Sequence, residues 1–102
     1  MNTLTREIII PKIKEYFVTQ PVTRAWLFGS FSRGEETDKS DVDILVDFDK
    51  DARIGLFKYA GMYGDLKELL GREVDLVQNG ALKPFAVESA ERDKILIYER
   101  TN

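Results

Sequence analysis

Hydrophobic and polar residues follow two different periods along this chain, and these periods predict its helices and strands. Apolar residues recur at helical spacing in some stretches, whereas other stretches alternate at the two-residue period of a strand. The predicted order is helix, strand, strand, helix, strand, helix and short strand, over residues 4–18, 24–28, 42–48, 54–70, 73–77, 82–92 and 95–98. This order predicts an α+β fold of two layers, with a mixed sheet and helices packed mainly on one face.

The first helix is predicted over residues 4–18. Thr3 or Thr5 is expected to begin it, and Pro11 is expected to kink it or to mark a later first turn. The apolar stripe of this helix consists of Ile9, Ile13, Tyr16 and Phe17.

The second long helix is predicted over residues 54–70 and is expected to end at Gly71. Tyr59 and Tyr63 are expected on its wetter face. The residues expected to face the sheet are Phe57, Ala60, Leu66, Leu69 and Leu70. Three glycines in or next to this helix are interpreted as close packing against the sheet rather than as room for a nucleotide: Gly55, Gly61 and Gly64.

Two of the strands carry further expectations. In the first strand, Trp26 and Phe28 point away from the side of Leu27, so at least one of the two aromatic rings is expected in the core. Base stacking is the weaker interpretation of Trp26. The last strand, over residues 95–98, is expected at an edge of the sheet.

Length and composition restrict the class of protein. Of 102 residues, 43% are hydrophobic and 32% charged, so we expect one soluble domain over residues 1–102 with a single core. Because the chain has no cysteine and no histidine, a metal ion must be held by oxygen ligands. No apolar stretch approaches the ~20 residues of a membrane span, and the first ten residues lack the features of a leader. We therefore expect a cytoplasmic protein.

The charge balance is mildly acidic. Lys and Arg number 15 against 18 Asp and Glu, which gives a formal net charge of −3. This balance argues against tight, sequence-independent binding of long nucleic acid, and therefore against a polymerase role.

The candidate chemistry begins at Gly29-Ser30, which interrupts the chain between two predicted strands. A glycine lets the backbone approach a ligand closely, and the hydroxyl of Ser30 adds a donor beside exposed N–H groups. Residues 30–34 are expected to form a short helical turn whose free N–H groups suit phosphate oxygens. Arg33 supplies a positive charge, which could bind phosphate or pair with an acidic neighbour: Glu35, Glu36 or Asp38.

Three aspartates follow this turn. Asp41 and Asp43 are two residues apart on a strand, so their side chains leave the same face, about 6.6 Å apart along the backbone. Such a pair can share two Mg²⁺ ions, which stabilise the attacking and the leaving oxygen of a displacement at phosphorus. Asp75, in the strand over residues 73–77, is the candidate third carboxylate. Without histidine, Asp75 is also our candidate for the general base.

Other polar residues near these aspartates have plainer interpretations. Asp47, Asp49 and Asp51 match the same spacing, but we interpret them as a solvated strand end and helix entry, with Asp51 able to cap the helix. Ser40 is interpreted as orienting the start of the strand through a hydroxyl-to-backbone bond. Each motif alone would fit an ordinary turn or strand face. Their combination favours nucleotidyl transfer.

The combination resembles a known family. GSFSRGEETDKSDVDILV resembles the signature of the DNA polymerase β-type nucleotidyltransferase superfamily, and EVDLV resembles its third-carboxylate strand. The chain is most similar to the minimal nucleotidyltransferases, and the resemblance covers nearly its whole length. It implies a polymerase β-like core in which Gly29-Ser30 binds the nucleotide triphosphate, Asp41 and Asp43 bind metal, and Asp75 binds metal and activates the acceptor hydroxyl.

The resemblance also implies a partner. Minimal nucleotidyltransferases are similar to the antitoxin half of two-gene systems whose toxin is a HEPN-domain ribonuclease, and they transfer AMP from ATP onto a tyrosine of that toxin. The leading hypothesis is therefore Mg²⁺-dependent nucleotidylation of a protein hydroxyl. One alternative is an antitoxin that only masks its partner. Another is an enzyme acting on a small molecule or an RNA end.

Overall fold

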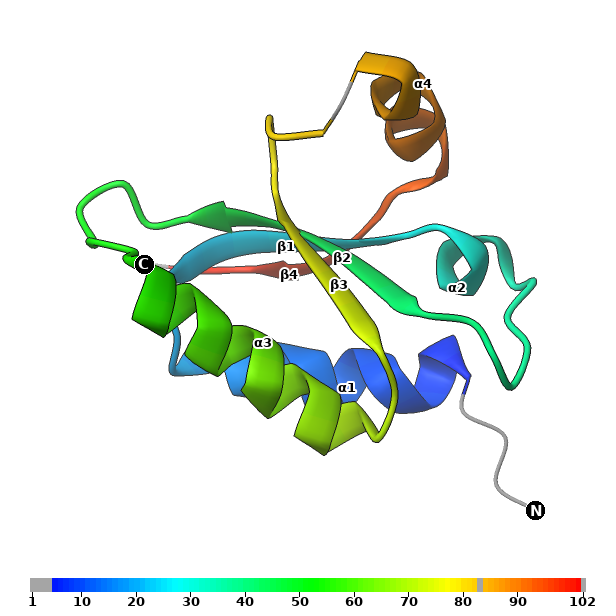
Figure 1. Ribbon diagram of the computed structural model, residues 1–102, viewed down its shortest axis with the longest axis horizontal. Coiled ribbons are helices and arrows are strands. Elements are labelled where there is room, and N and C mark those ends of the chain that lie inside the picture. Colours follow the sequence, from blue (N-terminus) through cyan, green and yellow to red (C-terminus); the bar gives the residue numbers. More distant parts are fainter. Residues whose placement is uncertain (1–4, 83, 102) are drawn as a thin grey trace.

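Four strands form one mixed sheet in the order β3-β2-β1-β4 (Figure 1). The structure is a computed structural model that describes residues 5–82 and 84–101. β1 runs antiparallel to β2 and β4, while β2 and β3 are parallel, so the predicted mixed sheet is confirmed. The elements are α1 (Arg6–Val18), β1 (Val22–Phe28), α2 (Ser30–Arg33), β2 (Val42–Phe48), α3 (Leu56–Leu70), β3 (Val74–Gln78), α4 (Pro84–Asp93) and β4 (Ile95–Glu99).

The core lies between the sheet and two of its helices. Figure 1 shows α1 and α3 together on one side of the sheet and α4 on the other side. Residues from both helices and from all four strands are buried there, and the largest of them with no exposed surface are Phe17, Phe31, Ile9, Ile13, Leu27 and Ile44. Burying apolar surface of this kind is the main favourable contribution to folding. The opposite face of the sheet is left for the polar side chains described below.

α1 begins one residue after Thr5 and runs through Pro11, so the predicted later first turn is wrong. The Thr5 carbonyl accepts the N–H groups of Ile8 and Ile9, each at 3.0 Å, but its side chain makes no capping hydrogen bond. Ile9, Ile13 and Phe17 are buried as predicted, and Tyr16 packs partly buried beside them. The expectations placed on Thr3 and Leu4 lie outside the described residues.

α3 turns only part of its predicted face to the sheet: Leu66 and Leu70 are buried as predicted, but three other residues are not. Phe57 is 92% exposed, and Ala60 and Leu69 are also exposed, so these three expectations are wrong. The buried residues of α3 are Met62, Leu66 and Leu70. These lie four residues apart, and at ~100° per residue Phe57 stands about 140° away from Met62 around the helix. Tyr59 and Tyr63, expected to be wet, pack partly buried against the core on the side of Met62.

Two further expectations about packing are wrong. A Cβ built on Gly55, Gly61 or Gly64 would meet no atom within 4 Å, so these glycines do not allow a close approach between α3 and the sheet. In β1, neither Trp26 nor Phe28 belongs to the core, because Ala25 and Leu27 occupy the buried side and both rings stand partly exposed on the other. The Nζ of Lys94 lies 4.9 Å from the centre of the Trp26 ring.

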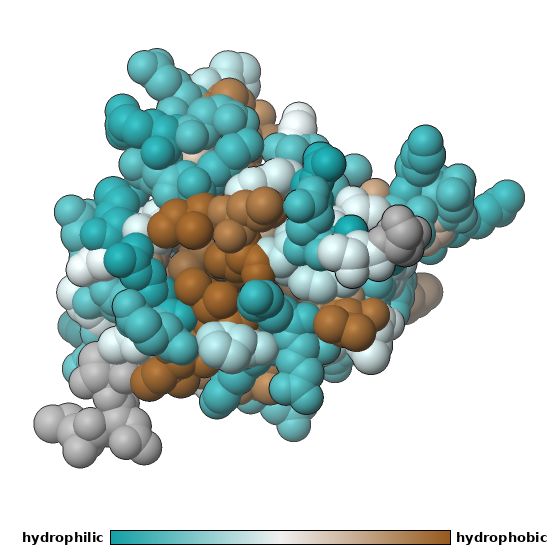
Figure 2. All heavy atoms as spheres, turned by 180° about the vertical axis from the view of Figure 1, so that it is seen from behind, coloured by the Kyte–Doolittle hydropathy of each residue, from teal (hydrophilic) through white to brown (hydrophobic). Residues whose placement is uncertain are grey.

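β4 lies at an edge of the sheet, as predicted. Beside it the molecule presents apolar side chains to solvent, namely Ile8 and Val18 of α1 and Ile95 and Leu96 of β4. Figure 2 shows hydrophobic side chains gathered on the back of the molecule, surrounded by polar ones. Among the described residues, no helix is both long and apolar enough to cross a lipid bilayer.

Candidate active site

The turn after β1 is built around Gly29, whose backbone conformation other residues rarely adopt. Gly29 has φ 72° and ψ −153°, in the region that favours glycine. A Cβ at this position would also collide with Oδ2 of Asp43. The sequence predicted a close approach of this backbone to a ligand, and the structure shows a close approach to a carboxylate. The turn and the aspartate strand therefore meet directly.

α2 follows as one helical turn. The Gly29 carbonyl accepts the N–H groups of Ser32 at 3.1 Å and Arg33 at 3.2 Å, and the Ser32 hydroxyl at 2.8 Å. Gly34 ends the turn in the left-handed region with φ 72°, which confirms the predicted helical turn ending at this residue. The guanidinium of Arg6, at the start of α1, donates to the Ser32 carbonyl at 2.7 Å and so holds the turn from outside.

Two of the three predicted aspartates stand side by side. β2 and β3 are parallel neighbours, and Asp43 is the direct partner of Asp75 in their register. The buried residues beside each aspartate along its strand face the core, so both carboxyl groups leave the opposite face of the sheet. The sequence predicted that Asp75 completes the site if its strand lies beside β2. The structure confirms that the two strands are neighbours.

The three aspartates act on one another electrostatically. The pKa of Asp43 is raised to about 6, chiefly by burial and then by the negative charges of Asp75 and Asp41, while the charge of Arg33 opposes this rise. Asp43 is half-buried, whereas Asp41 and Asp75 are exposed. Crowding of like charges around a partly buried carboxyl group is common at functional sites.

The fit of this group to a metal ion is incomplete. Within residues 5–82 and 84–101, no three acidic side chains converge closely enough to hold one ion. Carboxylate oxygens are the donors that Mg²⁺ prefers, and a cation would relieve the repulsion that acts on Asp43. The carboxylate donors are thus of the kind that binds a divalent cation, although Asp41, Asp43 and Asp75 do not lie close enough together to bind one ion jointly.

Arg33 makes two ion pairs. Its Nε lies 2.7 Å from Oε1 of Glu35, and its Nη1 lies 2.9 Å from Oδ2 of Asp93 at the end of α4. Pairing with Glu35 was one of the alternatives left open by the sequence. Sequence analysis missed Asp93, because the two residues are 60 positions apart and no local pattern joins them. Arg33 is therefore near Asp43 but engaged by carboxylates.

Arg72 was also missed, and it contacts the loop that leads to Asp41. Its Nη1 donates to the carbonyls of Thr37 and Ser40. Only its place directly after Gly71 and before the strand of Asp75 could have drawn attention to it. The prediction for Ser40 is confirmed, since its hydroxyl accepts the Thr37 N–H at 2.8 Å.

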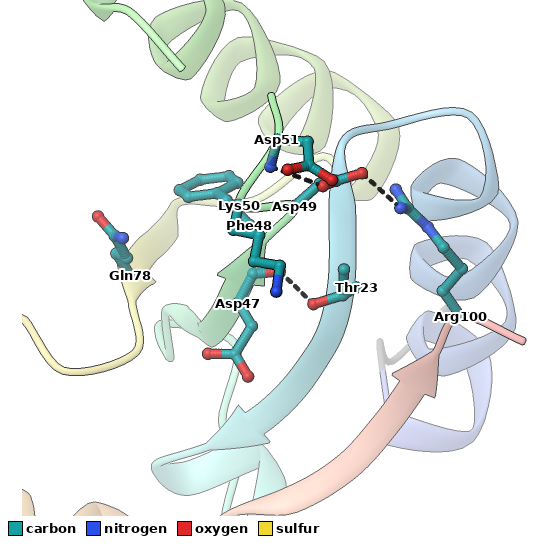
Figure 3. A pocket seen from close by; sticks show the side chains of 8 residues that line it. All are labelled: Thr23, Asp47, Phe48, Asp49, Lys50, Asp51, Gln78 and Arg100. Atoms are coloured by element: carbon teal, nitrogen blue, oxygen red, sulfur yellow. Dashed lines mark hydrogen bonds and ion pairs between the residues drawn. The ribbon is translucent and has the colours of Figure 1, made fainter. Parts of the chain in front are cut away.

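The remaining aspartates lie at the other end of the strands, around a polar pocket (Figure 3). Asp49 pairs with Arg100 at 2.7 Å and accepts the Asp51 N–H at 2.9 Å. Asp47 accepts the side-chain amide of Asn79 at 3.0 Å. Their assignment outside the catalytic site agrees with this placement, but Asp51 does not cap α3, whose N-cap is Gly55.

Comparisons with known proteins agree with this geometry. A family model described as the nucleotidyltransferase domain matches residues 9–97. The protein adenylyltransferase MntA of Thermococcus cleftensis is 39% identical over 71 residues, which cover 70% of this chain and 70% of that protein. A relative from Methanocaldococcus jannaschii is 36% identical over 100 residues, which cover 95% of this chain and 100% of its own.

Solved structures share the fold. A chain of a toxin-antitoxin complex with AMP-PNP superposes with a TM-score of 0.74 at 20% identity, covering 90% of this chain and 74% of that one. A chain from the tri-AMPylated Shewanella oneidensis HEPN toxin in complex with its MNT antitoxin gives a TM-score of 0.67 at 17% identity, covering 94% and 74%. The predicted polymerase β-like nucleotidyltransferase fold is confirmed.

Proposed function

Because this chain belongs to the nucleotidyltransferase domain family, we propose that it transfers AMP from ATP onto a hydroxyl group of a partner protein. We further propose that residues 1–102 act as one minimal nucleotidyltransferase domain. The observation that carries the proposal is the meeting of three elements on the open face of the sheet: Asp43 beside Asp75, with the Gly29 turn against the Asp43 carboxylate.

The proposed chemistry assigns a task to each motif. Gly29, Ser30 and Arg33 bind the phosphate groups of ATP. The acceptor hydroxyl oxygen attacks the α-phosphorus and forms a new P–O bond. The bond between the α-phosphorus and the oxygen that bridges to the β-phosphate breaks, and pyrophosphate leaves. Asp75 takes the proton of the hydroxyl. Its exposure supports this task, because an acceptor from another molecule has to reach it.

Asp41, Asp43 and Asp75 are the residues that would hold Mg²⁺. Bound there, two such ions would neutralise charge that develops on the phosphate oxygens. Arg33 would have to exchange at least one of its carboxylate partners for a phosphate, since Glu35 and Asp93 both engage it. The pair with Glu35 is solvent-exposed on both sides, so exchange of this partner costs little.

The proposed acceptor is a tyrosine of a HEPN-type toxin, and the proposed biological role is that of an antitoxin. One support is a relative named a protein adenylyltransferase. Another is the structural similarity of this chain to a chain from the complex of an AMPylated HEPN toxin with its MNT antitoxin. Use of ATP places the proposed reaction in the cytoplasm.

Transfer of label tests the proposal. The protein is incubated with a HEPN partner, Mg²⁺ and ATP labelled at either the α- or the γ-phosphate. We expect α-label alone on the partner. Asp41→Asn and Asp75→Asn should reduce transfer at least about a hundredfold, since each removes a charged group from the reacting centre. Asp51→Asn is the matched control, because it removes an exposed carboxylate at the other end of the strands.

Other outcomes would decide against the proposal. Full transfer by Asp41→Asn or Asp75→Asn would contradict the roles assigned here. A partner that binds but takes no label would favour antitoxin action by masking alone, an alternative consistent with the open ligand set. Label on a small molecule or an RNA end would show that the acceptor is not a partner protein.

A further inference from the structure

Arg72 joins the catalytic elements of the site without belonging to their motifs. It follows Gly71, which ends α3 in the left-handed region with φ 63°, and it precedes the strand that carries Asp75. Its Nη1 donates to the carbonyl of Thr37 at 2.7 Å and to that of Ser40 at 3.1 Å. Both carbonyls belong to the loop between α2 and β2.

Residues 37–40, whose first and last carbonyls accept from Arg72, form a closed turn. The Ser40 N–H donates to the Thr37 carbonyl at 3.1 Å, and the Thr37 N–H donates to the Ser40 hydroxyl at 2.8 Å. The Lys39 N–H also donates to the Thr37 hydroxyl at 3.2 Å. Arg72 therefore holds both ends of a turn that is already bonded within itself, so the turn and the guanidinium move as one body.

The guanidinium of Arg72 is itself fixed by an aromatic ring. Its central carbon lies 5.5 Å from the centre of the Phe31 ring, within the range of a cation–π contact. Phe31 is completely buried and directly follows Ser30 in α2. One side chain thus connects the phosphate-binding turn to the loop before Asp41.

Asp41 is held on both sides by the segment that contains Arg72. The residue before it, Ser40, bonds to the Arg72 side chain, and the residue after it, Val42, donates its N–H to the Glu73 carbonyl at 2.9 Å. Asp41 is exposed, so the position of its carboxylate depends on its backbone. The backbone of Asp41 is therefore fixed by residues that lead directly into β3.

We propose that Arg72 is a positioning residue for Asp41: it fixes the backbone on which the Asp41 carboxylate stands near Asp43. The link to cation binding rests on the proposed function, whereas the fixing of the Asp41 backbone by Arg72 does not. Groups that orient metal ligands through hydrogen bonds change metal affinity about 10- to 100-fold when removed. An ordinary loop contact would change stability alone.

The test compares Arg72→Met with Arg72→Lys. Methionine still covers the Phe31 ring but has no donor, whereas lysine keeps the charge and can bond one carbonyl. Lys67→Met is the matched control: Lys67 is a cation at the same corner, pairs with Glu73 at 2.7 Å and lies 5.5 Å from the Tyr63 ring. The first readout is Mn²⁺ affinity by electron paramagnetic resonance in the presence of AMP-PNP. The second is amide hydrogen exchange at Ser40 and Val42.

We expect Arg72→Met to weaken Mn²⁺ binding about tenfold and to speed exchange of the Ser40 amide, with Arg72→Lys between it and the native protein. Lys67→Met should change neither. A folded Arg72→Met variant with native Mn²⁺ affinity and native exchange would overturn the inference. If Arg72→Met does not fold, Arg72→Lys decides by the same readouts. Failure of the proposed function alone would show as absent label transfer by the native protein, while the exchange rates would still report on Arg72.

Discussion

At the scale of single residues, two kinds of constraint meet at Gly29. The positive φ disfavours other residues because of the backbone, and a Cβ at this position would displace the Asp43 carboxylate. Gly34 has the same φ of 72° but a ψ of 24° and open space where a Cβ would stand. Gly34 therefore serves as a reference for positive φ without contact with Asp43.

We predict that Gly34→Ala destabilises the protein by about 1 kcal/mol from backbone strain, and Gly29→Ala by more, because the ψ of −153° at Gly29 is one that almost only glycine adopts. Only Gly29→Ala should also abolish nucleotidyl transfer, because the new Cβ displaces Asp43. Urea unfolding and label transfer measured on the same samples check both parts. Equal activity of the two variants would show that the contact with Asp43 has no catalytic role.

At the scale of elements, α4 connects to the site through its last residue. Asp93 is only 12% exposed and pairs with Arg33 of α2. The Arg33 guanidinium holds the pKa of the Asp93 carboxyl below its usual range, so this group is charged at neutral pH. A triphosphate that binds Arg33 competes with this carboxylate.

We predict that Asp93→Asn lowers the KM for ATP about two- to fivefold with little change in kcat. The reason is that the charged Asp93 carboxylate, whose ion pair is of modest strength, no longer competes with ATP for Arg33. Steady-state kinetics with a fixed acceptor concentration measure this. Glu91→Gln, on the same helix and paired with Lys94 at 2.9 Å, is the control. A raised KM in Asp93→Asn would mean instead that Asp93 holds Arg33 in its binding position.

Elements also show where prediction from sequence succeeds. The strands that carry Asp43 and Asp75 were predicted from apolar residues on either side of each aspartate, and these residues are buried, which leaves both carboxylates on one face. The face of α3 was predicted only in part: Leu66 and Leu70 are buried as expected, but apolar residues such as Phe57 and Leu69 occur on another side of that helix, and the sequence does not say which side meets the sheet.

Long-range partners were beyond prediction for a different reason. The contacts of Arg33 with Asp93 and of Arg72 with Thr37 join residues 60 and 35 positions apart. Hydrogen bonds between such distant residues depend on how the loops fold onto the sheet. No periodicity or motif records that arrangement, so the sequence indicates candidate site residues but not the residues that hold them.

At the scale of the whole molecule, the end of the sheet opposite Asp41, Asp43 and Asp75 is closed by an ion pair. Arg100, directly after β4, pairs with Asp49, directly after β2 (Figure 3), and also donates to the Gln20 carbonyl at 3.3 Å. The Arg100 guanidinium holds the pKa of the Asp49 carboxyl below its usual range. Three separate parts of the chain meet here.

We predict that Asp49→Asn lowers the melting temperature by a few degrees at pH 7. Because folding lowers the pKa of Asp49, its stabilisation is fully present above pH 3.8 and is lost as the pH falls through the lower folded value. The difference in melting temperature should therefore shrink in strong acid. Asp51→Asn, an exposed neighbour, is the control. A difference independent of pH would assign the effect to packing.

The sheet order has a consequence for the time at which the protein becomes complete. β1 lies between β2 and β4, and Arg24 pairs with Glu99, 75 residues further along the chain. During synthesis the strands of Asp43 and Asp75 leave the ribosome before β4, so β1 keeps one open edge until β4 emerges. An open edge can pair with a strand of another chain. The nascent protein is thus exposed to misassembly after the strands that carry the candidate aspartates have been synthesised.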